Sequence, residues 1–147
     1  MTQQGKLEAI WLKRMKGGPM DAKEQATLKI DSGLVGNANQ SGKRQVSIIE
    51  KEVWENLMGT LGANLDASSR RANLMVSGVQ LAETRGKVLK IGECRIRIYG
   101  ETKPCEQMDK AWHGLQEAMR PNWGGGAFGE VLDDGDIVVG DRVMWVE

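Results

Sequence analysis

Short strand-like runs separated by glycine dominate this chain, and they constrain its fold more than any other feature. The clearest run is residues 94–99, where Cys94, Ile96 and Ile98 alternate with arginine and tyrosine. A period of two is typical of a strand with one buried face. The 19 glycines supply the tight turns that such short strands need. Further strands are expected at residues 8–13, 26–30, 45–49, 73–79, 86–93, 127–132, 136–139 and 142–146.

Helical patterns are few and short. Residues 50–61 place Trp54, Leu57 and Leu61 on one face of a helix that Gly62 ends. Shorter helical pieces are expected after Pro104 and at residues 115–120, and residues 66–71 are expected to form a turn or a short helix. Many strands with so few helices indicate a mainly β fold, an antiparallel, Greek-key-like β-barrel with short peripheral helices, rather than alternating βαβ units. The 147 residues fit a single domain spanning 1–147.

Charge and composition narrow the possible partners. Twenty basic and twenty acidic residues are interspersed, and the chain has one Phe and one Tyr. A nucleic-acid reader normally shows a strongly basic face with aromatic platforms, so we expect neither nucleic acid nor a membrane as partner. With two cysteines, no apolar segment near the ~20 residues that span a bilayer and no signal-peptide pattern, we expect a cytoplasmic protein without a disulfide.

The two cysteines differ in their surroundings. Cys94 shares the apolar face of its strand, which predicts a buried, inert thiol. Cys105 follows Pro104 and Lys103, so we expect it in the first turn of a helix, where free backbone N–H groups and the lysine favour a thiolate. Cys105 is therefore the candidate reactive or metal-binding sulfur. The nearby carboxylates are either proton donors or solvated charges: Glu101, Glu106 and Asp109.

Three other features allow two interpretations each. His113 cannot form a zinc site alone, but two helical turns from Cys105 it could form a Cys–His pair or be a surface histidine. The glycines at 124–126 lack the lysine of a P-loop, so the sequence signal for a phosphate cradle is weak, and the alternative is a flexible turn. Residues 33–42 are small and polar, which fits a long binding loop or a mobile linker.

Four arginines flank loops or element ends: Arg44, Arg70, Arg71 and Arg120. Guanidinium groups hold phosphates and carboxylates through bidentate hydrogen bonds. In a chain of zero formal charge, this set beside a candidate thiolate suggests an anionic ligand close to a sulfur.

The order and spacing of several short motifs resemble the MOSC domain family, named for the C-terminal domain of molybdenum cofactor sulfurase. The resemblance extends from about Gly33 to Val143. Its carriers are the segments 33–36 (GLVG), 44–47 (RQVS), 70–74 (RRANL), 77–78 (SG), 89–92 (LKIG), 104–105 (PC), 125–129 (GGAFG) and 140–143 (GDRV).

The resemblance implies a β-barrel like that of pyruvate kinase and a role for Cys105. In the family, the matching cysteine carries sulfur as a persulfide or, in relatives such as the mitochondrial amidoxime-reducing component, ligates the molybdenum of the pterin cofactor. Arg71 and Asn73 match a motif that lines the same pocket. Arg44, Arg120 and Lys103 complete the residues expected to hold the cofactor.

The sequence departs from the family at one loop. Many members have Gly-Asp-x-His where this chain has Gly36, Asn37, Ala38 and Asn39. Two amides keep hydrogen-bonding capacity but remove a proton acceptor and a good metal ligand. No fused sulfurase, iron–sulfur or second barrel module accompanies the domain, so pyridoxal phosphate is not expected.

Three functions follow as alternatives. The first is binding of the molybdenum cofactor, with reduction of small N-oxygenated substrates by electrons from an external reductase. The second is a metal-free sulfur carrier or sulfurtransferase, in which a cysteine desulfurase gives Cys105 a persulfide. The third is a non-catalytic binding module, favoured by Asn37 and Asn39.

Overall fold

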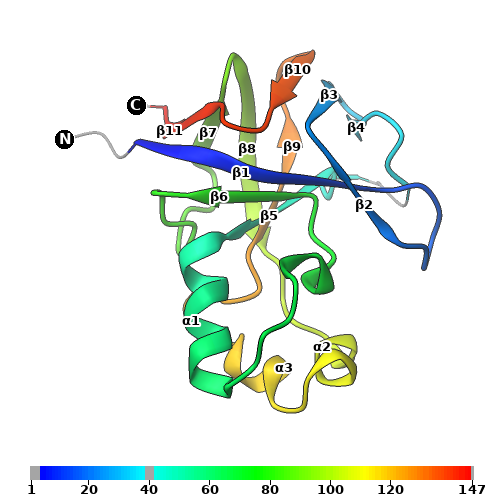
Figure 1. Cartoon of the computed structure of the whole chain (residues 1–147). Coiled ribbons are helices and arrows are strands. Elements are labelled where there is room, and N and C mark those ends of the chain that lie inside the picture. The colour runs from blue at the N-terminus through cyan, green and yellow to red at the C-terminus, as the bar shows by residue number, and fades with distance from the viewer. Residues whose placement is uncertain (1–3, 39–41, 147) are drawn as a thin grey trace.

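A computed structural model of the chain describes residues 4–38 and 42–146, and its centre is a closed β-barrel. Within the described residues, seven strands pair in a ring, and β1 closes it by pairing with both β6 and β11. In ring order the strands are β1 (Gln4–Lys13), β11 (Arg142–Trp145), β7 (Val88–Ile91), β8 (Cys94–Glu101), β9 (Ala127–Val131), β5 (Val46–Glu50) and β6 (Leu74–Ser77). The mainly β barrel expected from the sequence is confirmed (Figure 1).

Four further strands lie outside the ring. β2 (Met20–Lys23) forms a hairpin with the second half of β1. A small second sheet has the order β10 (Gly135–Val138), β3 (Gln25–Lys29) and β4 (Gly33–Leu34). β4 falls inside the segment expected to be an irregular loop, and residues 39–41 of that segment lie outside the described part.

One pair of strands in the barrel is parallel, although the sequence predicted an antiparallel barrel. β5 and β6 run in the same direction, with Ile48 opposite Leu74. Parallel neighbours cannot be joined by a tight turn, so the chain must cross over from the end of β5 to the start of β6. The crossover contains α1 (Lys51–Leu61) and η1 (Ala67–Arg70).

The barrel interior is filled by the alternate residues of its strands. In β8 the exposed side chains Arg95, Arg97 and Tyr99 alternate with buried ones. Large side chains that are at most 1% exposed fill the centre: Leu7, Ile10, Ile48, Leu74, Leu89, Ile91, Ile96 and Ile98. Burying such a side chain stabilises the fold by about 1.5–3 kcal/mol, so this layer holds the strands in register.

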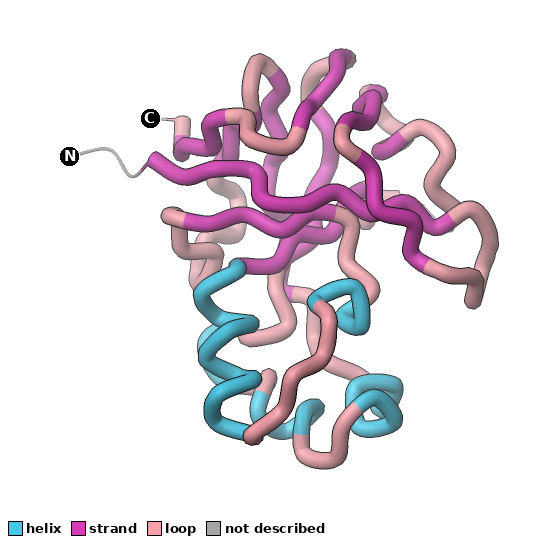
Figure 2. The backbone as a smooth tube through the Cα atoms, viewed as in Figure 1, coloured by secondary structure: helices cyan, strands magenta, loops and turns pink. Residues whose placement is uncertain are grey.

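The helices gather at one end of the barrel, as Figure 2 shows. They are α1, α2 (Glu106–Ala111), α3 (Leu115–Ala118) and the short 3₁₀ turn η2 (Pro121–Trp123). Trp54, Leu57, Met108 and Leu115 form a second, smaller apolar cluster between them. Within the described residues, the helices are all too short or too polar to cross a membrane.

Two local expectations around Cys105 are corrected. Cys105 has extended backbone angles and caps α2 rather than lying in its first turn, because the helix begins at Glu106. α2 ends at Ala111, and Trp112 is again extended, so the chain turns before His113. The continuous helix that would place His113 above Cys105 does not exist.

The glycine run at 124–126 is a close-packed crossing rather than a flexible turn or a phosphate cradle. A Cβ on Gly125 would lie 2.2 Å from the carbonyl oxygen of Thr102, and one on Gly126 would lie 2.2 Å from that of Ile48. Gly126 also has a φ of +93°, which side chains rarely tolerate. These glycines let the chain pass between β5 and the segment after β8.

We therefore expect Gly126→Ala to destabilise the protein by about 2–4 kcal/mol, through the steric overlap and the strained φ together. Gly59 is the matched control, because nothing lies within 4 Å of its added Cβ and it is within α1. Gly59→Ala should stabilise by about 0.5–1 kcal/mol. Urea unfolding measures both, and equal effects of the two changes would contradict the close packing.

A buried carboxylate makes stability depend on pH. Glu50 is 8% exposed, and its Oε2 accepts a hydrogen bond from the backbone N–H of Leu81 at 3.2 Å. Burial, assisted by the charge of Glu52, raises the pKa of Glu50 above its ordinary value. Ionised Glu50 therefore lowers the free energy of unfolding. This destabilisation is absent at a pH below the unfolded-state pKa of Glu50, and it reaches its full size once the pH exceeds the folded-state pKa.

Glu50→Gln should remove that cost while still accepting the hydrogen bond from Leu81. We expect it to raise the free energy of unfolding at pH 8 by on the order of 1 kcal/mol and to change it little at pH 4. Glu55→Gln, on the exposed face of α1, is the control and should have no comparable effect. A loss of stability at pH 8 in Glu50→Gln would show that the charge is needed.

Candidate functional site

A pocket of about 230 Å³ opens at the end of the barrel that faces the helices. Its walls come from the β1–β2 hairpin, the loop before β5, the crossover around η1 and the segment after β8. Four of the lining side chains are cationic and none is a carboxylate, within the described residues. The lining residues are Lys13, Met20, Asn37, Ala38, Arg44, Gln45, Val46, Ser47, Arg70, Arg71, Asn73, Thr102, Cys105, Gln107, Met108 and Phe128.

Cys105 supplies the sulfur of this pocket. It is exposed, and its carbonyl oxygen accepts a hydrogen bond from the backbone N–H of Met108, which fixes the residue at the start of α2. Cys94 is 2% exposed in the barrel core, and burial raises the pKa of its thiol. The prediction that Cys94 is buried is confirmed, and of the two thiols Cys105 is the accessible one.

Arg70 is a buried cation without a carboxylate partner in the described structure. It is 8% exposed, and its Nε and Nη2 both donate to the carbonyl oxygen of Gly125, at 3.0 and 2.7 Å. Burial, with a contribution from the charge of Arg44, lowers the pKa of Arg70, whereas a thiolate at Cys105 acts in the opposite direction. An uncompensated buried guanidinium is costly, so an anion in the pocket would stabilise it.

Arg71 and Lys13 add charge on the side of the β1–β2 hairpin. Nη2 of Arg71 donates to the carbonyl oxygen of Gly18, which ties the crossover to the hairpin. Arg71 has a φ of +62°, an uncommon conformation for a residue with a side chain. Burial and the nearby charges of Arg71 and Lys16 lower the pKa of Lys13. The cations at this wall therefore repel one another, as expected of a site that receives an anion.

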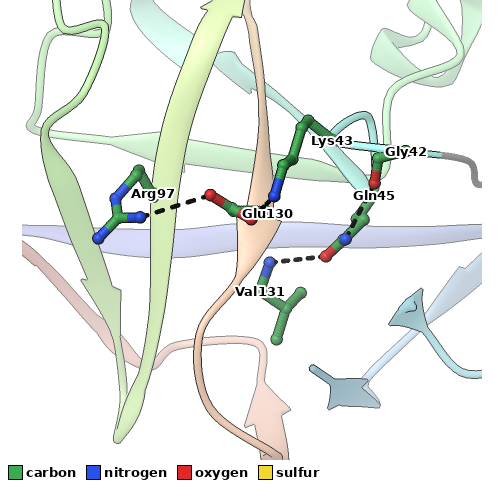
Figure 3. Close-up of polar contacts among 6 residues, drawn as sticks. All are labelled: Gly42, Lys43, Gln45, Arg97, Glu130 and Val131. Carbon is green, nitrogen blue, oxygen red and sulfur yellow. Dashed lines mark hydrogen bonds and ion pairs between the residues drawn. The ribbon is translucent and has the colours of Figure 1, made fainter. Parts of the chain in front are cut away.

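Arg44 and Gln45 line the pocket from the segment before β5. The guanidinium of Arg44 lies 4.5 Å from the ring centroid of Phe128, a cation–π contact. Gln45 is buried, donates to the carbonyl oxygen of Gly42 and accepts from the backbone N–H of Val131 (Figure 3). Gln45 thus fixes the loop that presents Arg44 to the barrel.

Asn73 joins three parts of the pocket wall through its side chain. Its Nδ2 donates to the carbonyl oxygen of Trp11 at 3.2 Å and to Oδ1 of Asn37 at 3.1 Å, and its Oδ1 accepts from the backbone N–H of Ser47 at 3.2 Å. Asn37 Oδ1 also accepts from the backbone N–H of Lys13. The amide of Asn73 is therefore used within the protein, and its role is to position the wall. Asn39 lies outside the described residues.

Thr102 lines the pocket and carries an unpartnered buried hydroxyl. Its Oγ1 is buried and has no hydrogen-bond partner among the described residues. The groups that the pocket lining offers to a ligand include the exposed thiol of Cys105 and four cationic side chains. This set fits a phosphate-bearing group that carries a thiophilic metal. No group of three or more histidine, cysteine or acidic side chains that could hold a metal ion exists in the described residues.

The structure gathers part of the predicted site. Cys105, Arg44, Arg70, Arg71 and Asn73 converge on the pocket. Several candidates do not line it: Lys103, which is exposed; Arg120, which pairs with Glu117 at 2.8 Å; His113; and Glu101, Glu106 and Asp109.

Sequence reasoning missed Lys13, Thr102 and Phe128 as lining residues. Lys13 ends β1, and Phe128 lies between the glycines of the 125–129 motif. The position of Thr102, between the candidate strand and Cys105, was the available signal for its proximity to the sulfur.

Comparisons with known proteins agree with this architecture. The MOSC domain family model matches residues 14–144. The crystal structure of the YuaD protein from Bacillus subtilis has a TM-score of 0.80 at 17% sequence identity, covering 100% of this chain and 99% of that one. YiiM from Geobacillus stearothermophilus has a TM-score of 0.77 at 15% identity, covering 97% of this chain and 75% of its own. At these identities the structural likeness shows the fold alone. No curated protein matches the sequence.

Thr102 provides a test of whether its buried hydroxyl lacks a hydrogen-bond partner in the ligand-free protein. Thr102→Val removes the unpartnered hydroxyl, so we expect ligand-free protein to gain up to about 1 kcal/mol in urea unfolding. Thr102→Ser keeps the hydroxyl and should give no gain. A clear loss of stability in Thr102→Val would mean that the hydroxyl is satisfied within the protein.

Proposed function

Because this chain belongs to the MOSC domain family, which is associated with molybdenum cofactor binding, we propose that its pocket binds the molybdenum–pterin cofactor through Cys105. The carrying observation is the combination in one cavity of an exposed thiol and four cationic side chains with no carboxylate among the described lining residues. A phosphate and a soft metal are complementary to these two features.

Each group would have a distinct role toward the cofactor. Cys105 would be the protein ligand of the metal, since thiolates are favoured by soft centres. Arg70 and Arg71 would hold the phosphate, and Lys13 and Arg44 would add positive charge to the lining. Asn73 would act through the wall that it positions rather than through contact.

When bound, the cofactor would supply two-electron transfer to or from oxygen-bearing substrates. The proposed reaction reduces an N-hydroxylated compound, in which two electrons and two protons break the N–O bond and yield the N–H compound and water. The pocket lining includes no carboxylic acid in the described residues, and in this proposal solvent supplies the two protons. The electrons would come from an external donor protein. Both cysteines are free, which fits a reducing compartment such as the cytoplasm.

A second candidate function is supported by the exposure of Cys105. A metal-free sulfur carrier needs an accessible thiolate and no further metal ligand. In that function, the Cys105 thiolate would attack the outer sulfur of a cysteine desulfurase persulfide. One S–S bond would form on Cys105 as the donor's S–S bond breaks, and the donor cysteine would leave as a thiolate.

Metal analysis and intact mass of the same preparation distinguish the functions. After expression in a host that makes the cofactor, we expect about one molybdenum per wild-type chain, strong loss in Cys105→Ser, and retention in Cys94→Ala, which keeps one thiol. An added sulfur on wild type and Cys94→Ala, with no molybdenum, would favour the sulfur carrier. If Cys105→Ser kept both its molybdenum and its affinity for the pterin cofactor, Cys105 would not be the metal-binding residue. A non-catalytic binding module would then be the better description.

A further inference from the structure

An exposed surface next to the pocket combines cations with aromatic rings. We call it the cation–aromatic face and define it by Arg44, Arg85, Arg97, Tyr99 and Phe128. The Tyr99 and Phe128 rings are 5.8 Å apart at a tilt of 36°, and the Arg44 guanidinium lies over Phe128. Nη1 of Arg85 donates to the carbonyl oxygen of Tyr99 at 3.0 Å. These contacts join Arg44, Arg85, Tyr99 and Phe128, and Arg97 is exposed two residues before Tyr99 on β8.

Strand pairing explains why these side chains lie together. β8 and β9 are antiparallel neighbours, with Arg97 opposite Glu130 and Gly100 opposite Phe128. The outward residues of β8 are therefore beside the outward residues of β9. β9 also pairs with β5, with Phe128 opposite Ser47, and this brings Arg44 to the same side.

The charge of this region is predominantly positive. Glu130 accepts a hydrogen bond from Lys43 at 2.9 Å and lies 3.5 Å from Arg97, so one carboxylate is shared by two cations (Figure 3). The charge of Asp31 also helps to raise the pKa of Lys43. Arg44 and Arg85 have no carboxylate within ion-pair distance in the described residues. In a chain of zero formal charge, the face is a local excess of positive charge.

The same region offers an apolar anchor and reaches the sulfur site. Tyr99 is 46% exposed, so its ring is available to a bound protein. Arg44 and Phe128 belong to the face and also line the pocket that contains Cys105. A protein bound here would therefore lie at the mouth of the pocket.

The contacts favour a protein over a nucleic acid as the occupant. Single strands bind by stacking bases on free aromatic faces. Here Arg44 already covers Phe128, and the tilted Tyr99 lies at its side, so the pair is not a stacking platform. Cations around an exposed tyrosine instead match an acidic protein surface, where charges steer association and an aromatic residue anchors it.

We propose that the cation–aromatic face is the docking surface for an acidic one-electron carrier protein that delivers electrons to the pocket. This inference rests on the proposed function. Two successive encounters would supply the two electrons that, with two protons from solvent, reduce one N–O bond to N–H and water.

The experiment compares two electron donors on the cofactor-loaded protein with an N-hydroxylated substrate. The first donor is a reduced plant-type ferredoxin, an acidic iron–sulfur protein, and the second is reduced methyl viologen, a small dication. At about 0.01 M salt, where charges act over about 30 Å, we expect Arg85→Glu and Tyr99→Ala each to lower the ferredoxin-dependent rate roughly tenfold. Turnover with viologen should stay unchanged, because neither residue lines the pocket.

Arg142→Glu is the matched control, since it makes the same charge change at an exposed position on β11, beside a different surface cavity. It should leave the ferredoxin-dependent rate near that of wild type. Calorimetric titration of ferredoxin into the three variants and wild type gives a readout independent of turnover, and added salt should weaken wild-type binding.

The outcomes separate the two hypotheses. If viologen supports no turnover, the proposed function fails. Calorimetric titration with ferredoxin still tests the cation–aromatic face in that case. If viologen supports turnover but Arg85→Glu binds ferredoxin as tightly as wild type, the docking surface is wrong. Tight binding of oligothymidylate that is lost in Arg85→Glu and Tyr99→Ala would identify a nucleic-acid surface and overturn the proposal.

Discussion

The parallel pairing of β5 with β6 determines where most of the pocket lies. Since the chain must return to the end of the barrel at which β5 starts before β6 can begin, the crossover through α1 and η1 brings Arg70 and Arg71 to that end, immediately before β6. Asn73 then holds this corner to β1 and β5 through Trp11 and Ser47. The pocket is thus built at a point where one change of strand direction brings separate segments together.

The buried guanidinium of Arg70 links this corner to the glycine crossing. Its two hydrogen bonds to Gly125 fix a loop that has no room for a Cβ at Gly125 or Gly126. The arrangement combines a desolvated cation with a rigid backbone, and both are costly in isolation. Sites that bind ligands often store such costs, because the bound group relieves them and rigidity preserves the geometry.

The distribution of charge over the surface, rather than the net charge, determines where this protein can attract an anion. Equal numbers of acidic and basic residues give the chain no net charge, yet the described pocket lining has cations without acids. Beside the neighbouring cation–aromatic face, Glu130 is shared by Lys43 and Arg97. The replacement of the family's acid by Asn37 agrees with this pattern. An amide can accept from Lys13 and Asn73 without neutralising the cations around it.

The sequence by itself determined the local structure and the difference between the thiols. Alternation in residues 94–99 predicted a strand that buries Cys94, the apolar face of residues 50–61 predicted α1, and Pro104 predicted a helix beginning near Cys105. These signals are local, since burial on one face sets the spacing of neighbouring residues. Only the tertiary structure decided that β5 and β6 are parallel. It also decided which cations line the pocket: Lys13, Arg44, Arg70 and Arg71 do, whereas Lys103 and Arg120 do not. Finally, it decided that Gly125 and Gly126 are packed against the backbone of neighbouring segments. Those outcomes depend on which strands pair across the barrel, and pairing partners distant in sequence leave no periodic trace in either segment.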